Sequence, residues 1–277
     1  MDENKKNSII NFDDKEKNII SFATSKGNLP KWHIDDNWYK SDAFGYENLS
    51  ECLISDLLKY SNMSSYVKYN LVKGIYKGEE KNFSESKDFL NKEENLLTLF
   101  RLYFLETGKE LSKEVYKISE IKERIEFVVD FISKNYKIDL VGERITSILE
   151  LDMFFLNEDR HFNNIALIRN TKKNAFNFAP IFDNGLSLLS DTREYKMETD
   201  IYINIDKVKS KPFCSSFVEQ CEIAESLYGS VLQFSFTKKD VLNEIEKYKE
   251  FYSNEIIERV TSIIFEQMRK YKYLFID

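Results

Sequence analysis

The fold is decided by one stretch of the sequence, residues 154–165, which reads FFLNEDRHFNNI. It begins at the end of an apolar run and abruptly becomes polar, placing Asp159 five residues before Asn164. Downstream, residues 179–185 read APIFDNG and contribute a further carboxylate, Asp183. Polar and charged side chains gathered without helical or strand periodicity indicate a functional site rather than a solvated face.

A β-hairpin is predicted between these two segments. Residues 165–169 and 175–179 are mostly apolar and flank a polar loop. We expect residue 169 to pair with residue 175, and residue 165 with residue 179, in an antiparallel ladder. Asn164 then lies at the open end of the hairpin, close to the turn that carries Asp183. Because Asp159 lies in the loop that leads into this hairpin, two carboxylates and an amide are predicted to meet at one point.

This set of side chains matches the needs of phosphoryl transfer from ATP. Mg²⁺ prefers hard oxygen ligands, and Asn164 and Asp183 would supply them. A separate carboxylate must orient the acceptor hydroxyl and take its proton, and Asp159 is the candidate. An Asp followed five residues later by Asn, and then by a second Asp beyond a hairpin, is the spacing of kinase catalytic and metal-binding loops.

The loop at 154–165 has two other interpretations, a structural turn and a nuclease site. Ordinary turn chemistry would pair Arg160 with Asp159 or Glu158 in a salt bridge. The matching turn with Asp183 at the far end of the hairpin argues against it. A metal-dependent nuclease would use Asp159, His161, Asp183 and a lysine, and the acidic balance of the chain opposes that reading.

The two segments resemble the catalytic core of HipA-like serine/threonine kinases, including the shorter bacterial HipA-related kinases. In that family an N-x-D-R-H-x-x-N loop precedes a hairpin and an A-P-I-F-D turn, and this chain has both. The shorter D-R-H-x-x-N pattern is also similar to that of phosphatidylinositol 3- and 4-kinases. Outside these segments the likeness is one of element order.

The resemblance implies an ATP- and Mg²⁺-dependent kinase. It implies that Asp159 is the catalytic base and that Asn164 and Asp183 bind the metal. His161 would stabilise the loop or the phosphate, and Arg160 belongs to the same catalytic set.

The resemblance also implies a lysine for the nucleotide phosphates and an acidic partner on a helix. Lys40, at the end of the strand at 38–40, is the best lysine, because it shares a strand face with Trp38. Glu51 on the following helix is its expected partner. Glu47 lies one turn earlier and stays an alternative.

The remaining nucleotide contacts are assigned by position. Residues 25–31 occupy the place of a phosphate-covering loop, with Gly27 and Asn28 as its candidate contacts. This loop has a single glycine, and the chain contains neither a GxGxxG nor a Walker A motif. The hinge between lobes is expected near residues 81–85, with Phe83 at the adenine.

The wider pattern predicts an α+β protein with a two-lobed, protein-kinase-like fold. Residues 1–85 are expected to form a small N-lobe with a sheet and one helix, and residues 86–277 a larger helical C-lobe. Only 8 Gly and 3 Pro residues occur, which favours helix in the second part. Strands are expected at 19–23, 31–34, 38–40 and 66–76, with a polar loop at 24–30 between the first two. Helices are expected at 47–60, 90–103, 118–135, 142–156, 217–229, 238–251 and 254–273.

Composition limits the partners and the compartment. The chain of 277 residues has 40 basic and 47 acidic residues, so broad binding to nucleic acid or to an anionic membrane is not expected. Its three cysteines, Cys52, Cys214 and Cys221, match no zinc pattern, which favours reduced thiols. Neither a signal peptide nor a stretch of the ~20 apolar residues that a span requires is found, so a cytoplasmic location is expected.

The phosphate acceptor stays open. A protein or peptide hydroxyl is the leading expectation. A small molecule, a lipid head group or an inositol phosphate on the same fold is the alternative, and a pseudokinase acting as a binding module is a third. Dependence on an antitoxin-type partner is in doubt because the chain is shorter than the long HipA toxins. The basic run at 207–211 is expected to be a solvated loop, with contact to an acidic substrate as the other reading.

Overall fold

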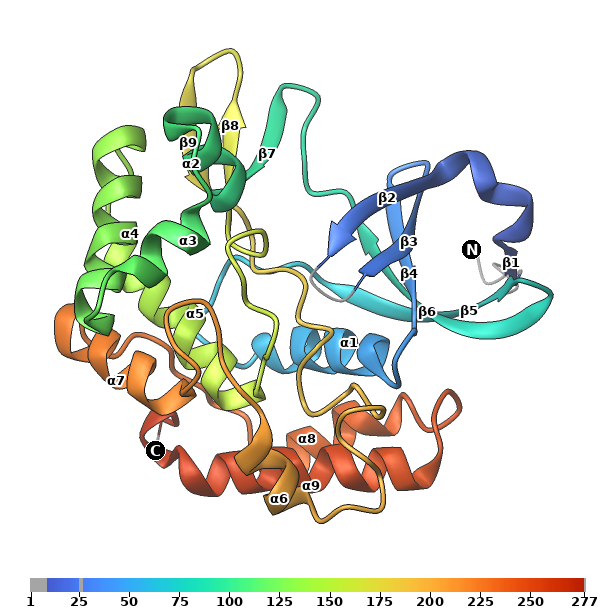
Figure 1. Cartoon of the computed structure of the whole chain (residues 1–277). Coiled ribbons are helices and arrows are strands. Elements are labelled where there is room, and N and C mark those ends of the chain that lie inside the picture. Colours follow the sequence, from blue (N-terminus) through green and yellow to red (C-terminus); the bar gives the residue numbers. More distant parts are fainter. Residues whose placement is uncertain (1–8, 25–26, 277) are drawn as a thin grey trace.

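The computed structural model describes residues 9–24 and 27–276. A strand-rich part lies on the right of Figure 1 and a helical part on the left and below. The first part contains β1 (Ile10–Asn11), the 3₁₀ helix η1 (Asp13–Asn18), β2 (Ile19–Thr24), β3 (Gly27–Ile34), β4 (Asn37–Ser41), α1 (Glu47–Leu58), β5 (Tyr69–Tyr76) and β6 (Glu79–Lys87).

The second part begins with a strand and continues mainly as helices. Its elements are β7 (Glu94–Thr98), α2 (Leu99–Thr107), α3 (Leu111–Lys117), α4 (Ile121–Tyr136), α5 (Val141–Phe155), β8 (Ala166–Asn170), β9 (Ala175–Phe178), α6 (Ile201–Lys207), α7 (Phe217–Tyr228), α8 (Lys238–Glu246), α9 (Asn254–Lys270) and η2 (Lys272–Leu274). The α+β class is confirmed. The division of the chain at residues 85 and 86 stays a prediction, and β6 runs two residues beyond it.

The large sheet has six strands in the order β1-β5-β6-β4-β3-β2. Its small core is aromatic: the rings of Phe12 and Phe83 stack with centroids 4.0 Å apart, and Trp32 and Tyr39 meet Phe12 at 5.0 and 5.4 Å. All four side chains are buried. Burial of so much aromatic area holds the strands that carry Lys31 and Lys40 in a fixed register.

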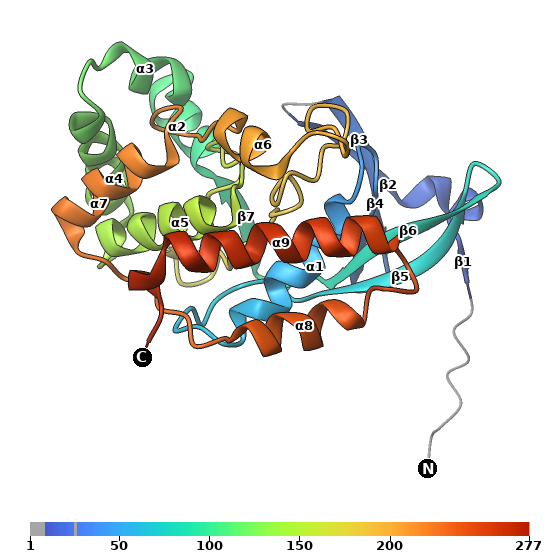
Figure 2. The ribbon, with the colours of Figure 1, turned by 90° about the horizontal axis from the view of Figure 1, so that it is seen from below.

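Helix α1 lies between the sheet and the two C-terminal helices, α8 and α9 (Figure 2). The predicted spacing is confirmed, because Leu49, Leu53, Ile54 and Leu57 are all fully buried. Burial on both sides leaves α1 little freedom to shift.

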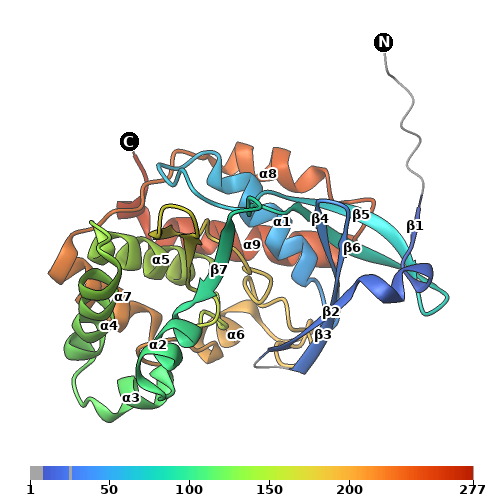
Figure 3. The ribbon, with the colours of Figure 1, turned by 90° about the horizontal axis from the view of Figure 1, so that it is seen from above.

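The expected helix at 90–103 is wrong for its first part, because residues Glu94–Thr98 form β7. This strand, seen from above in Figure 3, pairs antiparallel with β8 and gives a second sheet in the order β7-β8-β9 (Figure 1). The apolar run suits either structure locally, and the open edge of β8 decides it by offering backbone partners. Helix α2 begins at Leu99, where Thr98 accepts a hydrogen bond from the Arg101 backbone N–H.

The hairpin of β8 and β9 exists, but its predicted register is wrong by one residue. Asn170 pairs with Ala175, and Arg169 pairs with Phe176 instead of residue 175. The loop is shorter than predicted because Asn170 closes it, its side-chain oxygen accepting from the Lys173 backbone N–H, while Asn174 takes a left-handed conformation with φ 49°.

Other boundaries also differ from the sequence pattern. Gly27–Pro30 were expected in a loop and instead belong to β3, while Ser25 and Lys26 lie outside the described residues. The strand expected at 66–76 begins at Tyr69. Helices α3 and α6 and strands β1 and β6 were not predicted, and α8 ends at Glu246. Among the described residues, none of the helices has the length and apolar character needed to cross a membrane.

Candidate active site

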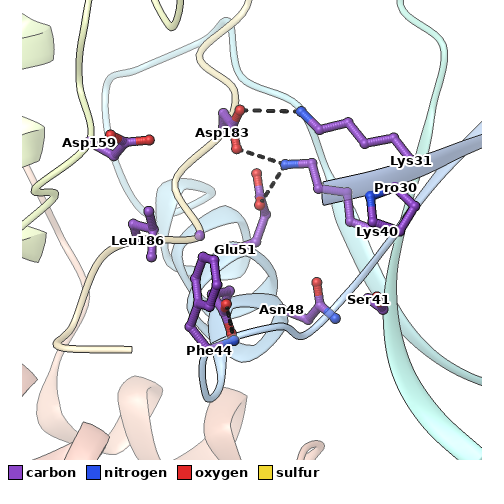
Figure 4. Close-up of a pocket in the computed structure, with 12 residues that line it drawn as sticks. Pro30, Lys31, Lys40, Ser41, Phe44, Asn48, Glu51, Asp159, Asp183 and Leu186 are labelled. Carbon is purple, nitrogen blue, oxygen red and sulfur yellow. Dashed lines mark hydrogen bonds and ion pairs between the residues drawn. The ribbon is translucent and has the colours of Figure 1, made fainter. Parts of the chain in front are cut away.

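Lys40 joins two parts of the site, the carboxylate on helix α1 and the carboxylate of the turn after the β8–β9 hairpin. Its ammonium group donates to Glu51 Oε2 at 3.0 Å and to Asp183 Oδ1 at 2.8 Å. Lys40 comes from β4, Glu51 from α1, and Asp183 from the turn after Pro180, as Figure 4 shows. Burial alone would lower the pKa of Lys40, but the two carboxylates outweigh it and raise that pKa well above its usual value.

A second lysine approaches the same carboxylate. Lys31 Nζ on β3 lies 3.5 Å from Asp183 Oδ2. Burial by itself raises the pKa of Asp183, yet Lys31 and Lys40 hold it far below its usual value. Asp183 takes a left-handed backbone conformation with φ 59°, which turns its side chain toward the lysines (Figure 4). The carboxylate is therefore ionised over the whole physiological pH range.

Glu51, rather than Glu47, is the partner of Lys40. The carboxylate of Glu47 accepts hydrogen bonds from the backbone N–H groups of Phe44 at 2.7 Å and Gly45 at 2.9 Å, so it holds the loop before α1. Glu51 also accepts from the backbone N–H of Asn184 at 3.2 Å, which ties α1 to the turn of Asp183.

A glycine lies next to this pair. A Cβ added to Gly185 would lie 3.1 Å from Glu51 Oε2 and 3.4 Å from the backbone oxygen of Glu47. A side chain at residue 185 would therefore press on the carboxylate that binds Lys40, and glycine avoids this contact.

The loop after α5 brings Asp159 and Asn164 together. Helix α5 ends where Leu156 adopts a left-handed φ of 57°, and Asn157 Oδ1 accepts from the Asp159 backbone N–H at 3.0 Å. Asn164 Nδ2 then donates to the Asp159 backbone oxygen at 2.9 Å. Asp159 lines the same cavity as Lys40 and Asp183.

The side chain of Arg160 has structural partners, and its assignment to the catalytic set stays a prediction. Its side chain is buried and pairs with Asp152 on α5 at 2.9 Å, so neither Asp159 nor Glu158 is its partner. Nη1 donates to the backbone oxygens of Asn164 at 3.2 Å and Phe182 at 2.9 Å. Because one guanidinium nitrogen contacts both segments, Arg160 fastens the Asn164 loop to the residue preceding Asp183.

His161 faces Asp159 from within the loop. Its Nε2 lies 3.7 Å from Asp159 Oδ2, and its backbone N–H donates to the Asp159 backbone oxygen at 2.8 Å. Its Nδ1 is buried and has no hydrogen-bond partner among the described residues. His161 is thus placed to orient the carboxylate of Asp159.

Phe83 does not lie at a hinge. It stands in the middle of β6, pairs with Val72 and Ser41, and its ring is buried in the aromatic core of the sheet. The strand continues to Lys87, so the crossing between the two parts of the molecule comes at residues 88–93. The sequence placed it too early because β6 was not recognised.

Gly27 and Asn28 lie in β3, where they pair with Thr24 and Ala23 of β2. Residues 27–31 of the predicted phosphate-covering loop therefore belong to strand β3. The assignment of these two residues to the phosphates stays a prediction.

Two adjoining cavities meet at Lys31, Lys40 and Asp183. The first lies on the side of Asp159 (Figure 4) and is lined by Pro30, Lys31, Lys40, Ser41, Phe44, Glu47, Asn48, Glu51, Asp159, Asp183, Gly185 and Leu186. The second lies toward the crossing segment and is lined by Lys31, Trp38, Lys40, Val67, Tyr69, Ser86, Lys87, Asp88, Phe89, Leu90, Leu96, Phe182 and Asp183. The two cavities share the charged groups of Lys31, Lys40 and Asp183. The first adds further carboxylates and is called the charged half, and the second adds mostly apolar side chains and is called the apolar half.

Sequence reasoning did not assign Lys31 or Lys211 to the site. Lys31 carried a usable signal, because it precedes Trp32 in a strand that pairs with the strand of Lys40. Lys211 belongs to the basic run at 207–211, which was expected to be a solvated loop or a contact for an acidic substrate. Its ammonium group donates to Asp159 Oδ1 at 3.0 Å, although 52 residues separate the two in the chain.

Comparison with solved structures finds proteins of similar fold. The crystal structure of the Helicobacter pylori proinflammatory kinase CtkA matches with a TM-score of 0.64 and 17% sequence identity, over 96% of each chain. This chain therefore has a two-lobed kinase-like fold. No family model matches the sequence, and no curated protein matches it.

A kinase-like fold consists of an N-lobe and a C-lobe, and the two parts of this molecule correspond to them. The six-stranded sheet with α1 is the N-lobe, and the helical part with the β7–β9 sheet is the C-lobe. Lys40 and Glu51 come from the first, while Asp159, Asn164 and Asp183 come from the second. At 17% identity the match shows the fold alone, so the specific resemblance to HipA-like kinases stays a prediction.

Proposed function

We propose that the protein is an ATP- and Mg²⁺-dependent phosphotransferase, and that it acts as a HipA-like kinase of serine or threonine hydroxyls in the cytoplasm. The observation that carries the proposal is the meeting of Lys40, Glu51 and Asp183 in one cleft, with Asp159 lining the same cavity. Kinases need such a lysine–glutamate pair and such a pair of carboxylates.

A nucleotide fits the two cavities by its chemistry. The apolar half, with Trp38, Phe89, Leu90 and Phe182, suits the flat face of an adenine ring, and backbone groups of the crossing segment border it. The charged half presents lysine ammonium groups that suit phosphate oxygens. The apolar and charged halves therefore match the two ends of ATP.

Asp183 and Asn164 are the candidate magnesium ligands. Asp183 is held ionised, which a metal ligand must be. Two protein oxygens suit Mg²⁺ because this ion keeps waters and takes its other ligands from phosphates. When bound, the ion would neutralise phosphate charge during transfer. Within the described chain, no three His, Cys, Asp or Glu side chains gather as an all-protein metal site.

Asp159 has the position expected of the base. It lies across the cavity from Lys40, as Figure 4 shows, and its loop is held by Asn157 and Asn164. An acceptor hydroxyl entering the charged half would meet this carboxylate and give up its proton to it.

The test is a transfer assay with γ-³²P-ATP, Mg²⁺ and both protein and small-molecule acceptors. Label on serine or threonine of a protein supports the proposal, with Asp159→Asn as the matched inactive control. Label confined to small hydroxyl compounds would keep the phosphotransferase and replace its acceptor. Magnesium-dependent ATP binding without any transfer would indicate a pseudokinase and overturn the enzymatic proposal.

A further inference from the structure

Lys211 contacts the carboxylate that is proposed to act as the base. Its Nζ lies 3.0 Å from Asp159 Oδ1, while the other oxygen of that carboxylate faces His161 Nε2 at 3.7 Å. The Asp159 side chain is only 11% exposed and that of Lys211 is 40% exposed. Asp159 lines the cavity of the site, so Lys211 contacts a group of that cavity, and the low exposure of Asp159 sets the pair apart from a freely solvated surface pair.

The segment that carries Lys211 is held rigidly against the C-lobe. Gln220, fully buried on α7, donates to the Lys211 backbone oxygen at 3.0 Å and accepts from the Phe213 backbone N–H at 3.3 Å. Arg124 of α4 donates to the Phe213 backbone oxygen at 2.8 Å. The Phe213 ring packs on Phe162 of the catalytic loop, with centroids 5.9 Å apart. These contacts fix the backbone from which the lysine reaches Asp159.

The lysines divide between the two carboxylates of the site. Lys31 and Lys40 contact Asp183, on the side assigned to the nucleotide. Lys211 contacts Asp159, on the side assigned to the acceptor. Negative charge on the transferred group passes from the first side toward the second, and a cation fixed on the second side stabilises it there.

We propose that Lys211 is a catalytic residue of the transfer site, which contacts the phosphoryl group as it reaches the acceptor. This inference rests on the proposed function. In the step, the acceptor oxygen forms a bond to the γ-phosphorus and its proton passes to Asp159. The bond from that phosphorus to the β,γ-bridging oxygen breaks, and its electron pair leaves with ADP. The Lys211 ammonium group donates hydrogen bonds to the phosphoryl oxygens throughout and undergoes no net change.

The experiment compares Lys211→Met, Lys211→Arg and the control Lys209→Met with the wild type. Lys209 is an exposed lysine of the same segment. We expect Lys211→Met to lower kcat about 100-fold while the KM for ATP changes by less than about twofold. Lys211→Arg should recover part of the rate because it restores the positive charge. Lys209→Met should behave as the wild type.

A binding measurement separates catalysis from folding. ADP with Mg²⁺ and aluminium fluoride imitates the transferring phosphoryl group, and it should bind the wild type more tightly than ADP with Mg²⁺ alone. Lys211→Met should lose most of the gain in affinity that aluminium fluoride gives the wild type, while keeping its affinity for ADP with Mg²⁺ alone. If the methionine variant does not fold, Lys211→Gln replaces it in both measurements.

The outcomes distinguish the two proposals. If the wild type transfers phosphate and Lys211→Met matches Lys209→Met in rate and in fluoride-dependent binding, only the role of Lys211 is overturned. If the wild type transfers no phosphate to any acceptor, the proposed function is overturned and this inference with it.

Discussion

At the scale of single residues, the site separates two tasks between two carboxylates. Asp183 is held ionised by Lys31 and Lys40 and points toward the nucleotide side. Asp159 stands across the cavity beside Lys211 and His161. Substitution of one carboxylate should therefore impair a different step from substitution of the other.

Asp159→Asn should abolish transfer while nucleotide binding persists. The change removes the proposed proton acceptor and leaves Asp183 and Lys40 in place. General-base catalysis of this kind contributes about 10²–10⁴-fold to the rate of enzyme reactions. Single-turnover transfer and ATP affinity measured on the same preparation check this. A variant with the wild-type rate would refute the assignment of the base.

Asp183→Asn should weaken binding of ATP in the presence of Mg²⁺ and have little effect in the presence of EDTA. The carboxylate is the proposed charged metal ligand, so its loss should remove the benefit of the ion and leave the proposed contacts to the adenine. Titration calorimetry with and without Mg²⁺ gives the comparison. Equal loss of affinity under both conditions would show that Asp183 does not act through the metal.

Arg160 is the residue whose loss should affect stability most. Removing it strands Asp152 as a buried charge and frees the backbone oxygens of Asn164 and Phe182, so Arg160→Met should lower the free energy of unfolding by about 3–5 kcal/mol. Lys134→Met, which breaks an exposed pair with Asp130, is the control, with an expected change below about 1 kcal/mol. Urea unfolding measures both, and similar values for the two would refute the role of Arg160.

At the scale of elements, α1 is tied to the C-terminal helices by polar contacts as well as by packing. Lys59 at its end contacts Glu244 of α8 at 2.6 Å, and Tyr248 donates to Asp56 at 2.8 Å. Just before α1, Asp42 accepts from the Tyr252 hydroxyl at 2.6 Å. Because α1 carries Glu51, these contacts also keep the partner of Lys40 in place. These contacts therefore help to fix the geometry of the lysine–glutamate pair.

The buried carboxyl group of Asp42 should make the free energy of unfolding depend on pH. Burial, with the Glu47 carboxylate nearby, raises the pKa of Asp42 to about 8. The folded protein therefore binds a proton there that the unfolded chain releases above its ordinary pKa of 3.8. This contribution is fully present below about pH 4 and is lost as the pH rises toward 8, by at most about 1.4 kcal/mol per pH unit.

Asp42→Asn tests that dependence, because asparagine does not titrate: its Oδ1 can accept from the Asn48 backbone N–H, and its Nδ2 can donate to the Tyr252 hydroxyl oxygen. The stability of the variant relative to the wild type should rise steadily between pH 5 and pH 8. Urea unfolding at several pH values gives the difference. A difference that stays constant with pH would show that Asp42 is ionised in the folded protein.

At the scale of the whole molecule, the cleft lies between two lobes that are joined through the crossing segment and through α1. A ligand that contacts both lobes stabilises the folded chain by mass action, by about 2.7 kcal/mol at a concentration 100 times its Kd. A non-hydrolysable ATP analogue with Mg²⁺ should thus raise the melting temperature. Adenosine should raise it less, because it lacks the phosphates that reach the lysines.

Sequence alone predicted most of the candidate site. Asp159, Asn164 and Asp183 were proposed because a short hairpin brings its two ends together, and Lys40 and Glu51 because strand and helix periodicities place them locally. The structure brings Lys40, Glu51, Asp159 and Asp183 to one cavity, while Asn164 lines a neighbouring one. The resemblance to known kinases pointed the same way. These inferences depend on contacts between residues that lie close in the chain, or within one element.

Only the tertiary structure decided the rest. Lys211 reaches Asp159, and Asp152 binds Arg160, through folding of distant segments that leaves no periodic trace. Strand β7 forms because β8 offers an open edge, and the interior place of Phe83 depends on the pairing of β6 with β4 and β5. Long-range burial and strand pairing outweigh local preference at such positions, and a linear sequence does not display which partners will meet.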